Sequence, residues 1–180
     1  MSSIIKVNTF QDANGNALFS SDGSGNVTTS ASGMQNTPAF DVELVGSQTF
    51  TNNVSTKVQF NTEVLDTDNC YDSTTNYRFT PTVAGKYFIY LVIGVNGNAD
   101  SNLNNMYAQL KKNGSQIALS HNNYNANSNR FGTCNVNAVI DFNGSTDYVE
   151  AFVQGFDNSG SPQVEEEPYS RFGGYKLIGA

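Results

Sequence analysis

Hydrophobic and polar residues alternate along much of this chain, the pattern of β-strands that have one buried and one solvent-facing side. In residues 56–64 the apolar side chains, among them Val58 and Val64, fall on one side and the polar ones on the other. Residues 39–44 and 133–142 alternate in the same way, and no segment of comparable length has the 3.6-residue period of a helix. The pattern predicts an all-β chain.

Turn-forming dipeptides lie between the predicted strands. Asn-Gly and Asp-Gly supply the positive φ angles that tight hairpin turns require. They occur at Asn14-Gly15, Asp22-Gly23, Asn96-Gly97, Asn113-Gly114 and Asn143-Gly144. Short strands separated by such turns are typical of antiparallel sheet proteins.

One predicted strand, residues 85–94, is apolar on both sides. The side chains concerned are Tyr87, Ile89 and Leu91 on one side and Phe88, Tyr90 and Val92 on the other. In an antiparallel sandwich one side of a strand packs on the opposing sheet and the other normally faces water. A loop or the N-terminal segment could cover the second apolar side. A subunit interface is the sharper hypothesis, because exposed apolar patches of that size are rare on monomers.

Residues 1–37 differ from the rest of the chain, because they hold too little apolar material for a core of their own. They predict either a flexible tail or a short, extended β arm that orders only against another chain. The apolar residues available for such a contact are Ile5, Val7, Phe10, Leu18 and Phe19. We therefore expect an N-terminal arm, residues 1–37, followed by a head domain, residues 38–180.

Charged residues are scarce: Asp, Glu, Lys and Arg make up 14% of the 180 residues, and 9 basic against 16 acidic ones leave a net charge of -7. Binding to phosphate backbones depends on clustered Lys and Arg, so we do not expect nucleic acid as a partner. No apolar stretch is long enough for a transmembrane helix, and the first residues lack the pattern of a signal peptide. We expect no membrane insertion.

The residue types that most often carry catalysis are nearly missing. The chain has one histidine, His121, in a polar run, and its two cysteines, Cys70 and Cys134, form no CxxC pair. Cys134 falls on the apolar side of its predicted strand, as a core residue would. Residues 66–72 hold three carboxylates, but their spacing is not that of an EF-hand and favours a polar loop. The sequence predicts no enzyme, no catalytic residue and no cofactor.

A series of motifs in the predicted head resembles a known family. The motifs are Pro38-Ala39-Phe40, Tyr77-Arg78-Phe79-Thr80-Pro81, Ala84-Gly85-Lys86-Tyr87-Phe88, Leu110-Lys111-Lys112-Asn113-Gly114, Asp147-Tyr148-Val149-Glu150 and Arg171-Phe172-Gly173-Gly174-Tyr175. In this order and spacing they resemble the globular head of the complement C1q family, within the C1q and tumour-necrosis-factor superfamily. The resemblance implies a ten-stranded antiparallel jelly-roll sandwich that assembles as a homotrimer. The residues that it places in the core or the trimer interface are Tyr87, Phe88, Ile89, Tyr90, Leu91, Val92, Phe172 and Tyr175.

The arm carries a second, shorter resemblance. Ile4–Asp12 and Asn16–Phe19 are similar to the short N-terminal segments of fibre-type and accessory structural proteins of bacteriophages. This resemblance implies a virion surface protein made in the host cytoplasm without a signal peptide: a capsid decoration, a head fibre or a small tail-fibre component. The arm would anchor it to other virion proteins, and the head would face outward for attachment or protein contacts.

Asn-rich segments offer a recognition surface on the head. Residues 94–105 and 120–130 combine neutral amides with a few aromatic and cationic side chains, which suits sugar or protein contacts. The candidates are Asn122, Asn123, Tyr124 and Arg130. Solvated loops at the end of a sheet explain the same residues equally well, so both interpretations stay open. The alternative function is accordingly a carbohydrate- or receptor-binding adhesin module that acts in host adsorption.

The family resemblance suggests one candidate cation site. Calcium occurs in some C1q-like proteins, and Glu165-Glu166-Glu167 would bring carboxylates of three subunits together if it lay near the threefold axis. A solvated loop is the simpler interpretation of this run. We expect no other metal.

Overall fold

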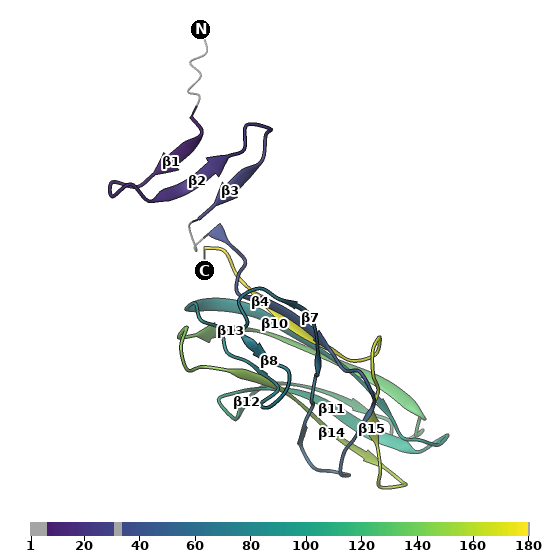
Figure 1. The fold of residues 1–180 in the computed structure, drawn as a ribbon. Helices are drawn as coiled ribbons and strands as arrows, with labels where there is room; N and C mark the ends of the chain where they lie inside the picture. Colours follow the sequence, from purple (N-terminus) through teal and green to yellow (C-terminus); the bar gives the residue numbers. More distant parts are fainter. Residues whose placement is uncertain (1–6, 31–33, 180) are drawn as a thin grey trace.

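The computed structural model describes residues 7–30 and 34–179, and almost all regular secondary structure within them is β-strand. The all-β prediction is therefore confirmed. The strands form one small sheet and two large sheets (Figure 1). The predicted anchor residue Ile5 lies outside the described residues.

The small sheet is formed by the N-terminal segment. It is antiparallel in the order β1-β2-β3, with strands Thr9–Gln11, Ala17–Ser21 and Val27–Thr29. Figure 1 shows it beyond the end of the large sheets at which β4 (Ala39–Glu43) begins. Within the described residues none of its strands pairs with a strand of the large sheets. We call β1–β3 the arm and β4–β16 the head.

The first large sheet has seven strands and is centred on β10, which pairs with β13 along one edge and with β16 and β15 along the other. Its strands are β4, β5 (Gln48–Thr49), β7 (Thr62–Asp66), β10 (Gly85–Asn96), β13 (Phe131–Phe142), β15 (Gln163–Val164) and β16 (Arg171–Lys176). β16 lies between β10 and β4, so the first and last strands of the head are neighbours.

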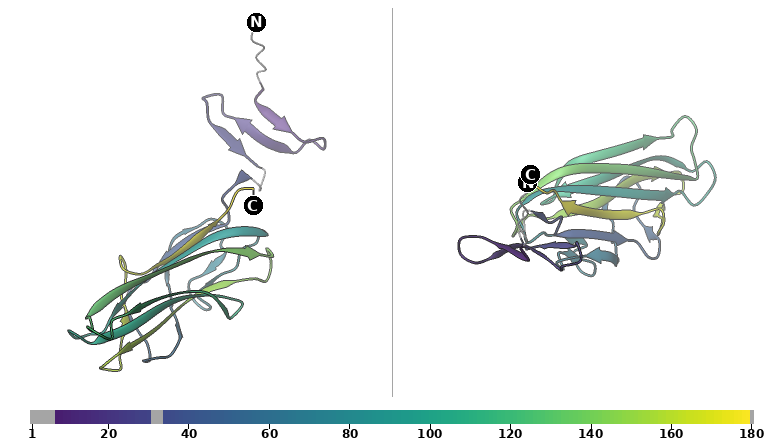
Figure 2. Two further views of the ribbon diagram at one scale, coloured as in Figure 1. Left: turned by 180° about the vertical axis from the view of Figure 1, so that it is seen from behind. Right: turned by 90° about the horizontal axis from the view of Figure 1, so that it is seen from above.

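The second large sheet has six strands in the order β12-β11-β14-β9-β8, and β6 also pairs with β14. Its strands are β6 (Thr56–Lys57), β8 (Tyr71–Asp72), β9 (Arg78–Phe79), β11 (Leu103–Lys112), β12 (Ser115–Asn123) and β14 (Val149–Asp157). The two large sheets lie one over the other, as the view from above shows (Figure 2). The chain passes repeatedly between them, which is the arrangement of a jelly roll.

The described part of the head contains thirteen strands, β4 to β16, where the resemblance implied ten. Five of the thirteen, β5, β6, β8, β9 and β15, are only two residues long, so they are brief pairings beside turns. The predicted architecture, an antiparallel jelly-roll sandwich, is confirmed.

Aromatic side chains from both sheets fill the core. Phe40 is central: its ring centroid lies 4.1 Å from that of Phe79 and 4.9 Å from that of Phe172. All three side chains are almost completely buried. Rings from strands far apart in sequence therefore join the two sheets, and truncating one such Phe to Ala costs about 3–5 kcal/mol in other proteins.

Residues 56–64 do not form the single strand that their alternation predicted. β6 pairs with β14 in the six-stranded sheet, whereas β7 pairs with β4 in the seven-stranded sheet. The chain crosses between the sheets at Val58 and Phe60, which are fully buried. Val64, predicted to lie on the same side, is 51% exposed. Beyond the crossing neither side of β7 is buried, since Leu65 is also 48% exposed, so the alternation no longer marks a core side there.

Candidate functional site

The second apolar side of β10 lies on the face of the seven-stranded sheet that points away from the core. The even-numbered side chains from Phe88 to Val92 are half-buried there, whereas their odd-numbered neighbours are fully buried. Phe88 pairs with Val139 on β13 and with Tyr175 on β16. Val139 is 57% exposed and Tyr175 39% exposed, and the ring centroids of Phe88 and Tyr175 are 5.7 Å apart. We call this surface the outer face: Phe88, Tyr90, Val92, Val139 and Tyr175, with the polar residues Asp41 and Arg171.

The arm does not cover the outer face. Figure 1 shows β1–β3 beyond one end of the sandwich, and Val139 and Tyr175 remain accessible in the described chain. The hypothesis that the arm of the same chain shields this apolar surface is therefore not supported. What is left is a solvent-exposed apolar sheet face of the kind that marks a protein contact.

An ion pair on β4 and β16 forms one polar part of the outer face, and the exposed Asn135 and Asn137 of β13, which pair with Val92 and Tyr90, form another. Arg171 binds Asp41 through two hydrogen bonds, from Nε to Oδ1 at 2.7 Å and from Nη2 to Oδ2 at 2.6 Å. The Tyr90 hydroxyl donates to Asp41 Oδ1 at 2.9 Å. Hydrogen bonding to Asp41 raises the pKa of Arg171, while burial and then the Asp41 carboxylate raise the pKa of Tyr90. The charges of Asp41 and Arg171 compensate each other, and Glu43, the partner of Arg171 on β4, adds a negative charge beside them.

Two adjacent glycines of β16 allow this arrangement. A Cβ at Gly173 would collide with the Tyr90 hydroxyl and ring, which lie across β16 on the way to Asp41. A Cβ at Gly174 would lie 2.5 Å from Ile89 Cδ1, on the core side of the sheet. The missing Cβ of Gly173 therefore leaves room for the Tyr90 ring on the outer face, and the missing Cβ of Gly174 leaves room for Ile89 in the core.

The structure divides the residues predicted for core or interface into two groups. Tyr87, Ile89, Leu91 and Phe172 are buried core side chains. Phe88, Tyr90, Val92 and Tyr175 lie on the outer face. The sequence did not single out Asp41, Arg171 or Val139 as part of this surface. The alternation of residues 39–44 puts Asp41, and that of residues 133–142 puts Val139, on the side away from the core, so two of the three could have been indicated.

The predicted anchor residues of the arm are largely accessible. Val7, Phe10 and Leu18 are 43%, 45% and 39% exposed. Phe19 is half-buried, because its ring stacks on that of Phe10 with centroids 4.4 Å apart. Their role in attaching the protein to a particle stays a prediction.

The predicted recognition residues use part of their bonding capacity within the chain. Asn122 Nδ2 donates to the carbonyl of Thr133 at 2.5 Å. Tyr124 packs against the core, and its ring lies directly over Gly132. Arg130 Nη1 lies 3.8 Å from Asp100 Oδ1, and both side chains are mostly exposed. Of the four candidates, Asn123 and Arg130 are the most accessible, and Asn123 Oδ1 accepts the N–H of Asn125 at 2.9 Å.

A buried aspartate organises the Asn-rich loops at the same end of the head, and the sequence analysis missed it. Asp157 Oδ2 accepts the Ser159 hydroxyl at 2.8 Å, and Asp157 Oδ1 accepts the N–H of Gly160 at 2.5 Å. Asn102 Nδ2 bonds to the Ser159 hydroxyl at 3.0 Å, and Asn98 Nδ2 bonds to the carbonyl of Ser161 at 2.7 Å. Many of the amides in these loops thus hold the loops in place. The run Asp157-Asn158-Ser159-Gly160, a turn signal, was the available clue.

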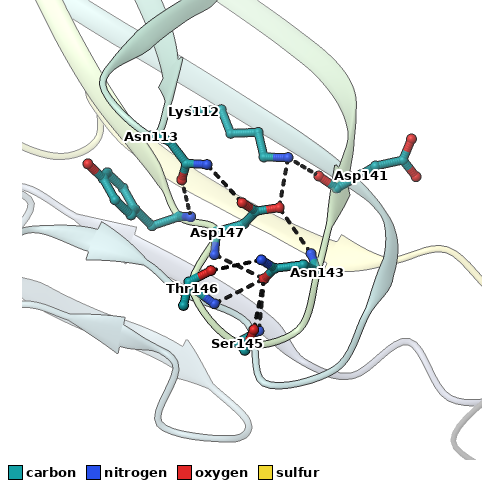
Figure 3. Close-up of polar contacts among 8 residues, drawn as sticks. Lys112, Asn113, Asp141, Asn143, Ser145, Thr146 and Asp147 are labelled. Atoms are coloured by element: carbon teal, nitrogen blue, oxygen red, sulfur yellow. Dashed lines mark hydrogen bonds and ion pairs between the residues drawn. The ribbon is translucent and has the colours of Figure 1, made fainter.

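A second polar cluster joins the β11–β12 turn to the β13–β14 loop (Figure 3). Asp147 Oδ2 lies 2.8 Å from Lys112 Nζ, and its Oδ1 accepts the Asn113 side-chain amide at 2.8 Å. Lys112 Nζ also donates to the carbonyl of Asp141 at 2.7 Å. Hydrogen bonds from Lys112 and Asn113 hold the pKa of Asp147 below its ordinary value. We call Lys112, Asn113, Asn143 and Asp147 the loop clamp, and its closed geometry indicates a structural role.

The three carboxylates of residues 66–72 do not form a metal site. Asp66 accepts the N–H groups of Cys70 and Tyr71 at 3.0 and 2.9 Å. Asp72 accepts donors from its own loop, chiefly the N–H of Thr75, and these hold its pKa well below the ordinary value. Across residues 7–30 and 34–179, no group of His, Cys, Asp and Glu side chains is arranged to hold a metal ion.

The described chain offers surfaces rather than cavities. No pocket is present among the described residues. No helix in this part of the chain is long and apolar enough to cross a membrane. Cys70 and Cys134 are both buried as free thiols, and burial raises the pKa of the Cys70 thiol. The outer face is accordingly the principal candidate site.

Comparison with known proteins agrees with this geometry. The family model of the C1q domain matches residues 39–177. Among curated proteins, no sequence matches this chain.

Solved structures show the same fold at low sequence identity. The globular domain of zebrafish complement 1qA protein is 15% identical, with 78% of this chain and 97% of that chain covered and a TM-score of 0.54. For murine APRIL at pH 5.0 the values are 12% identity, 77% and 98% coverage and a TM-score of 0.57. Eiger TNF from S. frugiperda is 14% identical, with 79% of this chain and 93% of that chain covered and a TM-score of 0.59. At these identities the likeness concerns the fold alone.

Proposed function

Because this chain belongs to the C1q domain family, we propose that it acts as a homotrimer whose three heads meet through the outer face. The observation that carries this proposal is the exposed apolar surface formed by Phe88, Val139 and Tyr175 beside a neutral ion pair. Burying such a surface against two other copies removes apolar area from water. A cyclic trimer closes on itself, so every copy of the face is covered.

Light scattering on the purified protein tests the trimer. The wild-type chain is expected to have the mass of three copies at micromolar concentration. Val139→Asp should yield monomers, because it places a carboxylate in each contact. Leu119→Asp is the matched control, since Leu119 is a similarly exposed apolar strand residue of the six-stranded sheet, 44% exposed against 57% for Val139. A wild-type monomer, or equal effects of the two substitutions, contradicts the proposal.

We further propose that the trimer is a structural protein on the surface of a phage particle, as a capsid decoration, head fibre or small tail-fibre component. The support is the resemblance of the N-terminal segments to fibre-type phage proteins, together with an arm whose strands form a sheet separate from the head. The arm would attach the protein to other virion proteins and leave the heads outward. Deletion of residues 1–30 should abolish incorporation into particles, and incorporation at the wild-type level would refute the anchoring role.

The alternative is an adhesin head that binds a host carbohydrate or receptor. The observation in its favour is that Arg130 and Asn123, which flank residues 124–129 of the Asn-rich segment, are both exposed. A glycan array probed with the wild type and with Arg130→Ala separates the two functions. Binding that Arg130→Ala weakens supports an adhesin, whereas a purely architectural protein binds no glycan.

A further inference from the structure

The two loops of the arm have the same structure, because Asp12 and Asn16 of the first loop recur ten residues later as Asp22 and Asn26 of the second. Asp12 Oδ1 accepts the N–H of Asn16 at 2.9 Å, and its Oδ2 accepts the Asn16 side-chain amide at 2.9 Å. Asp22 makes the same two bonds to Asn26, at 3.2 and 2.6 Å. Each loop is thus closed by its own side chains and needs no partner for its shape. The part of the arm that still lacks a cover is a face of its sheet.

One face of the arm sheet is apolar, and among residues 7–30 and 34–179 no strand packs against it. Phe10 pairs with Phe19, and Phe19 pairs with Thr29, so these side chains share a face. Alternation along β2 and β3 adds Ala17 and Val27 to it. We call Phe10, Ala17, Phe19 and Val27 the arm face. Phe10 is 45% exposed and Val27 67% exposed, although a three-stranded sheet depends on covering its apolar side.

The charge of the arm face favours copies of the same chain as the occupant. Its four residues and the flanking Ser21 are uncharged, and the two aspartates of the arm lie in the loops. In a contact between identical faces a charged residue lies close to its own copies and repels them, so a face without charge is suited to self-association.

The path of the chain into the head leads to the same occupant. The N–H of Lys176 donates to the carbonyls of both Asn36 and Pro38 at 3.3 Å, and Ala39 pairs with Tyr175 of the outer face. The chain therefore enters the head beside the surface that the proposed trimer buries. Three copies joined through that surface have their arms beginning close together.

We infer that the arm face packs against the arm faces of two other copies, so that the trimer contact of the heads continues into a three-chain stalk. The inference rests on the proposed trimer. It assigns Phe10 and Phe19 to contacts within the trimer and leaves Leu18, on the opposite face of β2, for contact with the particle.

Cysteine crosslinking of the full-length chain tests the inference. Val27→Cys places a thiol on the arm face, and Thr28→Cys, the next residue of β3, places one on the opposite face with a similarly exposed side chain. With copper phenanthroline as the oxidant, Val27→Cys should form disulfide-linked dimers on a non-reducing gel, and Thr28→Cys should not. Equal crosslinking of the two variants, or none from Val27→Cys, overturns the inference. If a virion protein covers the arm face instead, Val27→Cys forms no disulfide-linked dimers.

Light scattering on the same samples separates failure of this inference from failure of the proposed trimer. A trimer without selective crosslinking overturns the stalk and leaves the trimer of heads intact. A monomer overturns both.

Dilution of a serine variant is the second measurement. Phe10→Ser with Phe19→Ser should raise the concentration at which half of the trimer dissociates by about tenfold, because buried aromatic side chains dominate such contacts. Leu18→Ser, on the opposite face, is the control and should leave that concentration unchanged. Equal shifts in the two variants contradict the inference.

Discussion

The two outer faces of the sandwich differ in how their side chains are partnered. On the six-stranded sheet, polar groups bond to one another along the surface. Lys111 Nζ donates to Ser55 Oγ at 3.0 Å and lies 3.7 Å from the centroid of the Phe152 ring. Ser55 Oγ donates to Gln109 Oε1 at 2.9 Å, and Gln109 Nε2 donates to Gln154 Oε1 at 3.3 Å. The centre of this face is therefore a hydrogen-bonded polar network, although Ile117 and Leu119 on the neighbouring β12 are 43% and 44% exposed.

The outer face of the seven-stranded sheet lacks such a lateral network across its centre. Phe88 and Val139 are neighbours there, and the ion pair of Asp41 with Arg171 also receives the hydroxyl of Tyr90. The two sheets thus differ at the centre of their outer surfaces, which is a polar network on the six-stranded sheet and a group of apolar side chains on the seven-stranded sheet. The comparison teaches that the even-numbered residues of a single strand, β10, distinguish the two surfaces, and the proposed trimer contact uses the surface that they make apolar.

Substituting a strand glycine of each sheet should give the largest difference between them. Gly173→Ala brings a methyl group against Tyr90 and within 2.9 Å of the Phe40 carbonyl, so we expect a loss of about 3 kcal/mol of unfolding free energy. Gly155→Ala, in the six-stranded sheet, meets its nearest atoms at 3.2 Å and should cost about 1 kcal/mol. Urea unfolding of both variants measures the difference. Adding Tyr90→Ala should partly rescue Gly173→Ala, and equal costs without rescue would contradict the packing argument.

Neutralising one ion pair on each face tests which pair belongs to a subunit contact. Asp41→Asn removes the negative charge and replaces one of the two acceptor oxygens by an amide that cannot accept from Arg171, and we expect the trimer to dissociate at about tenfold higher concentration. Glu150→Gln breaks the pair with Lys57 on the six-stranded sheet and should lower unfolding stability without changing dissociation. Sedimentation over a dilution series measures dissociation. A trimer insensitive to Asp41→Asn would remove this ion pair from the interface.

Acid should weaken the loop clamp, which joins loops next to both sheets. The folded-state pKa of Asp147 lies below its ordinary value of 3.8, because Lys112 and Asn113 bond to the carboxylate. Its contribution to stability is therefore complete above pH 3.8 and is lost as the pH falls through the lowered pKa. Asp147→Asn should be less stable than wild type at pH 7, and the difference should shrink as the pH falls below 3.8 and the wild-type carboxylate is protonated. A difference that stays constant over this range contradicts the ionic role of Asp147.

The smallest effect is expected for the exposed ring pair of the six-stranded sheet. His121 stacks on Tyr107 with centroids 4.1 Å apart and planes 3° apart. His121→Ala should cost about 0.5–1 kcal/mol of unfolding free energy, as cross-strand aromatic pairs do. Thermal unfolding measures this cost, and light scattering should show an unchanged mass. A change in mass would show that this face also takes part in assembly.

Much of the head was predictable because its signals are local. The period of two along residues 85–94 identified both sides of β10, and the structure buries one side and leaves the other half-buried. Buried Cys134 on β13 follows from the same kind of alternation. The prediction failed at Val64, because the chain changes sheets between β6 and β7 and no local signal marks that crossing.

The composition of the candidate site needed the tertiary structure. Asp41 and Arg171 are 130 residues apart in sequence and meet because β4 and β16 are paired. The loop clamp likewise joins two motifs, one that contains Lys112 and Asn113 and one that begins at Asp147, that the sequence showed only as separate segments. Pairings of this kind depend on the order of strands in a sheet, which alternation does not encode.

The sequence by itself determined that this chain is an all-β protein with few charges, a doubly apolar strand and an N-terminal segment too poor in apolar residues for a core. These properties follow from residue type and spacing, which act over a few neighbouring positions. The tertiary structure decided that Tyr90 reaches Asp41 across Gly173, and that Phe10 and Phe19 share an uncovered face. Both depend on strand register, because a shift of one residue exchanges the two faces of a strand.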